Sequence, residues 1–321
     1  MLRKIFINQK TASHTQIAGV QFLITFRHKP SSYVCVLGSH ATLMVNFILL
    51  TCIYLSRALH QETRYLLLAN TLIADVLFLI FHLAKELCNA FGIEVSWIVC
   101  EFLIAVTSTA YCSAILSITL MVADTFAAVR WPLKYRELFP PARTHRILLG
   151  MWLFAAIYPL TLVIMIEDSS SHSRTLNMCL VLIYLGVMKT DTVGDHLYFT
   201  VCGIVCAMLI SYCYIRLYMV TKTQGIWQSR FSRARVTLLV HGFLLFLYFA
   251  PGFVFNIEII LFHRKDINQD VQVWISIINM SVLMLLPRAC APYLYGLRYR
   301  EIQETLMQLL KNRRPNQITI S

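Results

Sequence analysis

The sequence predicts an all-α fold in which seven helices cross a membrane and a short amphipathic helix follows. Composition is the first observation: 58% of the 321 residues are hydrophobic and only 14% are charged, whereas soluble proteins average about 25% charged residues. Length is the second, because the chain contains seven apolar stretches, each of the roughly 18 residues or more that a helix needs to cross the bilayer core.

The seven stretches are interrupted only by isolated polar residues, glycine and proline. Membrane helices tolerate these because neighbouring helices and side chains satisfy the freed backbone groups. Strands of a membrane barrel would instead alternate over about ten residues. The third stretch is the longest and must tilt or protrude. The predicted spans are Tyr33–Leu55, Tyr65–Ala90, Trp97–Phe126, Ile147–Ile166, His196–Val220, Val236–Phe262 and Val273–Leu297.

The placement of lysine and arginine predicts the orientation, because these residues are enriched in cytoplasmic loops. Seventeen of them lie in one set of linkers plus the tail, and five lie in the opposite linkers. We therefore expect an extracellular segment 1–32, a membrane domain 33–297 and a cytoplasmic segment 298–321 in the plasma membrane. Five basic residues within 1–32 argue the other way.

The net charge of +12 lies mostly on this cytoplasmic face, where it faces anionic lipid headgroups. No nucleic-acid-binding motif accompanies it. After Leu297, the residues Ile302, Leu306, Leu309 and Leu310 share one helical face. This spacing predicts an amphipathic helix along the inner leaflet, so membrane lipids are an expected partner.

Most of the ten cysteines lie inside the predicted spans, where cysteine behaves as a small apolar residue. Cys100, near the outer end of the third span, and Cys179, in the longest external linker, lie on the oxidising side. Each has two possible partners, because Cys88 competes for either of them. The residues alone leave these pairings open.

Two charged residues lie deep inside predicted spans. Asp75 is about ten residues into the second span, and Arg288 is deep in the seventh. A charge at mid-bilayer costs about 2.5–3.5 kcal/mol on insertion scales, so it needs a partner or a function. Asn46 in the first span is a candidate to complete a polar cluster with them.

Over nearly its whole length the chain resembles the rhodopsin-like, class A G-protein-coupled receptors. The order and spacing of several features carry this resemblance, rather than any single one. Pieces of them, LIAD, WPLKY and APYLYGLR, also resemble vertebrate odorant receptors. The features are Asn46, LANTLIAD ending at Asp75, Cys100, DTFAAVRWPLKY from Asp124, Trp152, Cys179, Pro251 and APYLYGLRYREI from Ala291.

The resemblance implies a Cys100–Cys179 disulfide, an extracellular ligand and a heterotrimeric G protein as partners, and no cofactor. An enzyme is not expected, since no metal-ligand spacing, nucleophile elbow or phosphate-binding loop occurs in the chain. The alternatives are an odorant-type chemosensory receptor and a non-signalling seven-helix scaffold.

The resemblance also implies a set of G-protein switch residues, of which this chain keeps some and replaces others. The family's aspartate–arginine–aromatic triplet reads Asp124, Thr125 and Phe126, so the arginine that packs into the G-protein interface is missing. Phe249 replaces the aromatic toggle, Ala291 replaces an asparagine, and Cys206 replaces a proline. We therefore expect weak or atypical coupling. The kept positions are Asp124, Pro132, Leu133, Tyr214, Arg233, Arg235, Pro251, Pro292 and Tyr295.

In the family, the residue matching Asp75 holds a sodium ion together with one matching Asn46. Arg288 lies one helical turn before Pro292 and is expected to point into the same space. A guanidinium fork suits a carboxylate. The hypothesis is an Asp75–Arg288 pair that replaces the ion and removes sodium regulation.

The predicted ligand pocket lies among the outer halves of the spans. Thr107 occupies the position at which amine receptors keep an aspartate, which disfavours a monoamine ligand. The candidate lining residues are His82, Lys85, Glu86, Thr107, Tyr111, Tyr198, Phe199, Phe253, Asn256 and Ser281.

Overall fold

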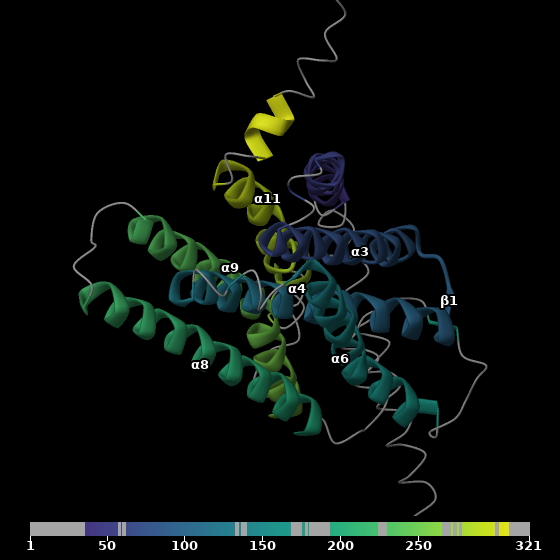
Figure 1. Cartoon of the computed structure of the whole chain (residues 1–321). Coiled ribbons are helices and arrows are strands. Elements are labelled where there is room, and N and C mark those ends of the chain that lie inside the picture. Colours follow the sequence, from purple (N-terminus) through teal and green to yellow (C-terminus); the bar gives the residue numbers. More distant parts are fainter. Residues whose placement is uncertain are drawn as a thin grey trace, which may run out of the picture.

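The computed structural model describes most of the helical part of the chain. The described residues are 36–56, 59, 62–131, 135, 140–167, 175–176, 179, 193–223, 230–264, 271, 275, 278–298 and 302–307. Within them, nearly all regular structure is helical (Figure 1). The helices are Val36–Leu55, α3 (Thr63–Phe91), α4 (Trp97–Arg130), α6 (Pro141–Glu167), α8 (Val193–Thr223), α9 (Arg230–Arg264), the π-helix η1 (Asn279–Leu283), α11 (Leu286–Arg298) and residues 302–307.

Four helical segments in the described part are long and apolar enough to cross a membrane. They are Val36–Leu55, Thr63–Asn89, Trp97–Ala128 and Leu239–Glu258. The predicted helical fold is confirmed, together with the first, second, third and sixth apolar spans. That the fourth, fifth and seventh stretches also cross stays a prediction.

The junction between α3 and α4 is a tight turn. Gly92 adopts the left-handed conformation with φ 65°, and the backbone N–H groups of Gly92 and Ile93 donate to the carbonyls of Asn89 and Cys88. Glycine suits this cap because it has no Cβ to clash. The short strand β1 (Val95–Ser96) follows, and the Ser96 hydroxyl caps α4 by accepting from the Val99 N–H at 3.4 Å.

A two-stranded antiparallel ribbon joins this turn to the linker after α6. β1 pairs with β2 (Thr175–Leu176), with Val95 opposite Leu176 and Ser96 opposite Thr175. The ribbon positions the linker beside the beginning of α4, three residues before the linker cysteine Cys179.

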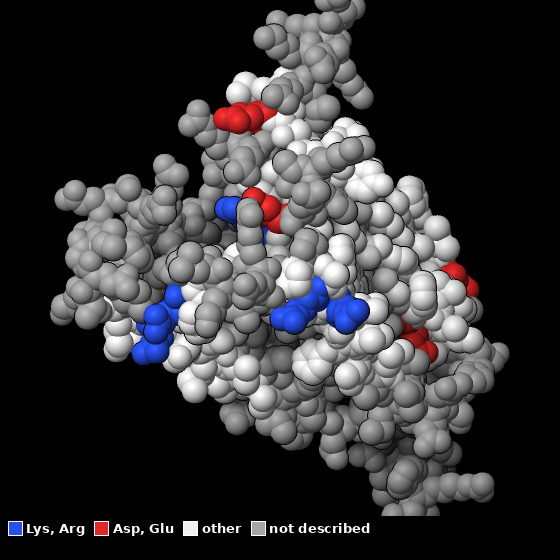
Figure 2. Space-filling model, viewed as in Figure 1, with Lys and Arg blue, Asp and Glu red and all other residues white. Residues whose placement is uncertain are grey.

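The centre of the fold is α4, which contacts α3, α6, α8 and α9 (Figure 1). The core cluster includes Leu72 of α3, Ile118 of α4, Leu244 of α9 and Ala291 of α11, all fully buried. Large apolar side chains also cover the outside; Leu153 and Phe246 are 65% and 69% exposed. Among the described residues on the face seen in Figure 2, charged side chains form a few separate groups between uncharged ones. Such a surface suits lipid better than water.

Candidate functional site

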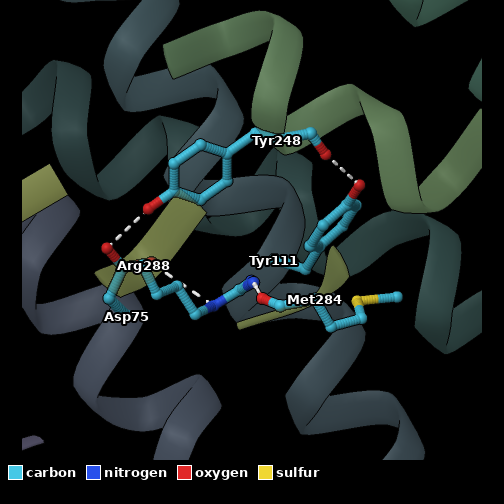
Figure 3. Close-up of polar contacts among 5 residues, drawn as sticks. All are labelled: Asp75, Tyr111, Tyr248, Met284 and Arg288. Carbon is cyan, nitrogen blue, oxygen red and sulfur yellow. Dashed lines mark hydrogen bonds and ion pairs between the residues drawn. The ribbon is translucent and has the colours of Figure 1, made fainter. Parts of the chain in front are cut away.

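A buried ion pair connects α3 with α11. Asp75 and Arg288 are both fully buried, and the Arg288 Nε lies 3.5 Å from the Asp75 Oδ1 (Figure 3). Opposite charges in a low-dielectric interior attract strongly, but each charge loses its hydration on burial. The pair therefore needs further polar contacts around it.

Aromatic side chains supply most of these contacts. The centre of the Arg288 guanidinium lies 3.3 Å from the ring centroid of Phe78, 5.5 Å from that of Tyr111 and 5.4 Å from that of Tyr248. Cations are attracted to the faces of aromatic rings, more so when water is excluded. The guanidinium thus contacts rings from three helices, α3, α4 and α9.

Two tyrosine hydroxyls complete the cluster (Figure 3). The Tyr248 hydroxyl donates to the Asp75 Oδ2 at 2.6 Å, and the Tyr111 hydroxyl donates to the Tyr248 backbone carbonyl. The sequence analysis placed Tyr111 in the ligand pocket and missed Tyr248 and Phe78. A buried carboxylate such as that of Asp75 needs hydrogen-bond donors. The sequence therefore indicates that a donor such as a tyrosine hydroxyl lies nearby, but it does not show which residue supplies it.

Asn46 is also fully buried. Neither its amide nitrogen nor its amide oxygen has a hydrogen-bond partner within the described part of the chain. The structure therefore shows no hydrogen bond that joins Asn46 to Asp75 or Arg288 among the described residues, and a role for Asn46 in this polar cluster stays a prediction.

A second polar junction ties three helices together. Asn70 of α3 donates through Nδ2 to the Ser117 hydroxyl of α4 at 2.7 Å and accepts from the Trp152 indole of α6 at 2.9 Å. One side chain thus satisfies groups on two neighbouring helices.

Replacing Asn70 by leucine is expected to lower the free energy of unfolding by about 1–3 kcal/mol, because the Trp152 indole N–H loses its acceptor and the Ser117 hydroxyl loses a donor. The measurement is the thermal unfolding midpoint of the detergent-purified protein. Thr51→Val is the control, since Thr51 is exposed and its hydroxyl donates to the Phe47 carbonyl of its own helix. Equal shifts in both variants would contradict the junction.

The end of α4 carries the altered triplet. Asp124 is 7% exposed, and the Tyr135 hydroxyl donates to its Oδ1 at 2.5 Å. Burial, and then the charge and hydrogen bond of Asp124, raise the pKa of the Tyr135 phenol above its usual value. The phenol therefore stays protonated and keeps its role as donor.

The other two triplet residues have different partners. The Thr125 hydroxyl donates to the Met121 carbonyl at 2.8 Å, within its own helix. The Phe126 ring packs edge-on against Trp131 and against Tyr212 of α8, with centroids 6.2 Å apart in both cases. Asp124 therefore accepts a hydrogen bond from a tyrosine, and the next position of the triplet is a threonine in place of the family's arginine.

The predicted switch positions on α8 and α9 lie partly at the core. Phe249 packs against the core cluster, and the buried Pro251 lies within α9. Tyr214 packs beside the Val122–Cys213 cluster between α4 and α8. The Cys206 sulfur accepts from the Thr119 hydroxyl at 3.5 Å.

In α11, Ala291 and Tyr295 are fully buried, and Pro292 lies within the helix. The Tyr295 ring faces His241 of α9 with centroids 6.1 Å apart. The predicted positions Pro132 and Leu133 fall outside the described residues. Arg233 and Arg235 lie in α9, but their side chains also fall outside what the structure describes.

The linker after α6 is attached to the helices at Cys179. The Cys100–Cys179 disulfide is present, with an S–S distance of 2.02 Å, and Cys88 is a free thiol that packs beside it. Asn89 adds a contact that the sequence analysis missed. Its Oδ1 accepts from the Cys179 N–H at 2.9 Å, and its Nδ2 donates to the Cys179 carbonyl at 3.3 Å.

One stripe of α3 connects the ion pair with this linker. Asp75, Phe78, His82, Glu86 and Asn89 follow at intervals of three or four residues, which places them on one helical face. All five are buried, at 0%, 2%, 1%, 1% and 4% exposure. The His82 ring stacks on Phe78 with centroids 5.3 Å apart.

The predicted pocket residues do not form one described group. Lys85 is buried like His82 and Glu86. Thr107 and Asn256 are half-buried, and their side chains donate to carbonyls of their own helices. Tyr198, Phe199 and Ser281 lie in helices, but their side chains fall outside the description.

Phe253 differs from the other pocket candidates, because it is 66% exposed. It lies five residues after the buried Tyr248, so it is rotated about 140° around α9 from that residue. The structure therefore places Phe253 on the outer surface and not with the buried candidates.

Comparisons with known proteins agree with this geometry. The family model described as "7 transmembrane receptor (rhodopsin family)" matches residues 45–295. The chain is also similar to the human protein named "Probable G-protein coupled receptor 148", with 33% identity over 288 residues, which cover 88% of this chain and 82% of the relative. The matched family range contains the ion pair, the altered triplet and both cysteines of the disulfide.

Proposed function

The chain belongs to the rhodopsin family of seven-transmembrane receptors, and on that premise we propose that it transmits an extracellular signal to heterotrimeric G proteins with weak or atypical coupling. Membership makes it a multi-pass membrane receptor and not an enzyme. The ligand, the coupling and residence in the plasma membrane belong to the proposal.

The observation that carries the proposal is the end of α4. The family's arginine is replaced by Thr125, whose hydroxyl is used within its own helix. Asp124 accepts from the Tyr135 hydroxyl, which belongs to the segment after α4. A short threonine cannot supply the long cationic side chain that packs into a G protein in this family, so the interface is expected to be weakened.

Topology and partners follow from the charge distribution. We place segment 1–32 outside the cell, domain 33–297 in the bilayer and segment 298–321 in the cytoplasm. In the helix at 302–307, Ile302 is 1% exposed and packs on the core cluster, whereas Met307 is 64% exposed. This division supports a helix lying along the inner leaflet, with lipid as a partner.

Two other functions remain as alternatives. An odorant-type chemosensory receptor is favoured by the LIAD, WPLKY and APYLYGLR segments. A non-signalling scaffold is favoured by the threonine in the triplet. For any of the three, Thr107 disfavours a monoamine ligand, because a half-buried hydroxyl that donates to its own helix provides no counter-charge.

Guanine-nucleotide exchange with the purified receptor tests the proposal. The parent is expected to stimulate exchange weakly across a panel of G proteins, and Thr125→Arg is expected to raise the basal rate severalfold, because it restores the cationic side chain. Thr125→Gln is the matched control, since it is long and polar but uncharged, and should leave the rate near that of the parent.

The outcomes separate a signalling receptor from a non-signalling scaffold. A gain with arginine and none with glutamine supports a receptor whose switch is weakened. The scaffold is favoured if neither the parent nor Thr125→Arg stimulates exchange, provided that a thermal unfolding transition shows both proteins to be folded. Strong exchange by the parent alone would show that the threonine does not weaken coupling.

A further inference from the structure

The seventh-helix region is broken just before Arg288. The π-helix η1 ends at Leu283, where the Met284 N–H donates to the Asn279 carbonyl five residues back. The α-helical pattern resumes at Leu285, whose carbonyl accepts from the Ala289 N–H at 2.9 Å. Met284 and Leu285 form a turn between the two helices.

Arg288 contacts this break with its own side chain. Its Nη1 donates to the Met284 carbonyl (Figure 3). The same guanidinium pairs with Asp75 on α3 and packs against rings of α3, α4 and α9. A single fully buried side chain thus joins the break in its own helix to three other helices.

We propose that Arg288 is a tethered counter-ion that fixes the conformation of the seventh helix. With the guanidinium seated, the break at Met284 is held against the α3–α4–α9 core. A movement of α11 away from α3 would separate Arg288 from Asp75 and leave two buried charges unpaired, which is strongly unfavourable. The conformational equilibrium of α11 is therefore set by the pair.

The covalent attachment has a direct consequence. A counter-ion that is part of the chain cannot exchange with the medium, so the charge of Asp75 stays balanced whichever small cation is dissolved outside. This receptor is therefore insensitive to the identity of the external monovalent cation. The alternative is that apolar packing, and not the charge, holds α11. In that case a variant that keeps only the apolar stem of Arg288 would hold α11 as firmly as the parent does.

The reporter for α11 is the free thiol of Cys290, which is half-buried two residues after Arg288. In full-length receptor in lipid nanodiscs, maleimide labelling is quantified for each cysteine by mass spectrometry. Cys52 of the first helix is 1% exposed and serves as the internal standard for global unfolding. The variants are Arg288→Met, which keeps the apolar stem, and the double variant Asp75→Asn with Arg288→Met, which buries no unpaired charge.

Both variants are expected to label Cys290 severalfold faster than the parent, with Cys52 unchanged. The double variant should regain thermal stability relative to Arg288→Met while its Cys290 stays fast, because neutrality is restored but the tie is absent. It carries the test if Arg288→Met does not fold. Arg64→Met is the matched control, since it removes an arginine from an exposed ion pair, with Glu62 at the start of α3. Cys290 in this variant should be labelled at the rate of the parent.

Three results would overturn the proposal. The first is unchanged Cys290 labelling in the folded double variant. The second is a parallel acceleration of Cys52, which would indicate general loosening. The third is a change in the parent's labelling or unfolding midpoint when sodium replaces N-methylglucamine at equal ionic strength. None of these measurements involves a G protein, so their failure is independent of the proposed coupling.

Discussion

Replacing Asp75 by leucine is expected to lower the free energy of unfolding by about 3–5 kcal/mol, because removing one partner of a buried ion pair leaves an uncompensated charge. Arg288 is fully buried and has no room to reach water without disturbing its ring contacts. The Tyr248 hydroxyl also loses the carboxylate that accepts its hydrogen bond. The measurement is the thermal unfolding midpoint and the yield of folded receptor.

The double variant Asp75→Leu with Arg288→Met separates charge from packing. It should recover most of the loss, since replacing a buried pair by apolar residues is often close to neutral. Tyr248→Phe should cost only about 1 kcal/mol, the size of one hydrogen bond. If the double variant were as unstable as the sum of both single variants, charge burial would not be the cause.

Loss of the Cys100–Cys179 disulfide is expected to cost about 2–5 kcal/mol, since the cross-link restricts the unfolded chain over a long loop. The two residues are 79 positions apart. Cys100→Ser is best measured in a Cys88→Ser background, because the free thiol of Cys88 packs beside Cys179 and is the alternative partner.

Asn89→Ala in the same background measures the second attachment of the linker. Its two hydrogen bonds to Cys179 are expected to be worth about 1–2 kcal/mol together. An unfolding midpoint that does not move on Cys100→Ser would mean that the disulfide contributes nothing to the stability of the protein. A loss with Asn89→Ala as large as that with Cys100→Ser would make the amide the main attachment.

The sequence predicted the helices well, because hydrophobic length is a local property. The second span was predicted over 65–90 and the helix occupies Thr63–Phe91. The ends of α4 and α9 were missed by four to six residues, as α4 continues to Arg130 and α9 begins at Arg230. Apolar composition marks the part of a helix in hydrocarbon, whereas hydrogen bonding continues into the polar region.

The candidate site was only partly predictable. Asp75 and Arg288 stood out because charges are rare in apolar spans. Tyr248, Phe78 and Asn89 did not stand out, since aromatic residues and an asparagine near a helix end are common, and their importance depends on how the helices are rotated against one another. The break at Met284 comes three residues before Pro287, which lacks the N–H that would continue the α-helical pattern. The sequence therefore carried a signal for the break, which the sequence analysis did not use.

The buried stripe of α3 places two distant contacts on the same face of one helix. Near the C-terminal end of α3, Asn89 hydrogen-bonds to both backbone groups of Cys179, and near its middle Asp75 pairs with Arg288. A disulfide alone permits the linker to pivot about the sulfur bonds, but the paired amide contacts remove that freedom. Because Asn89 and Asp75 lie on one continuous helix, a displacement of the linker that moved α3 as a rigid body would also move Asp75 relative to Arg288.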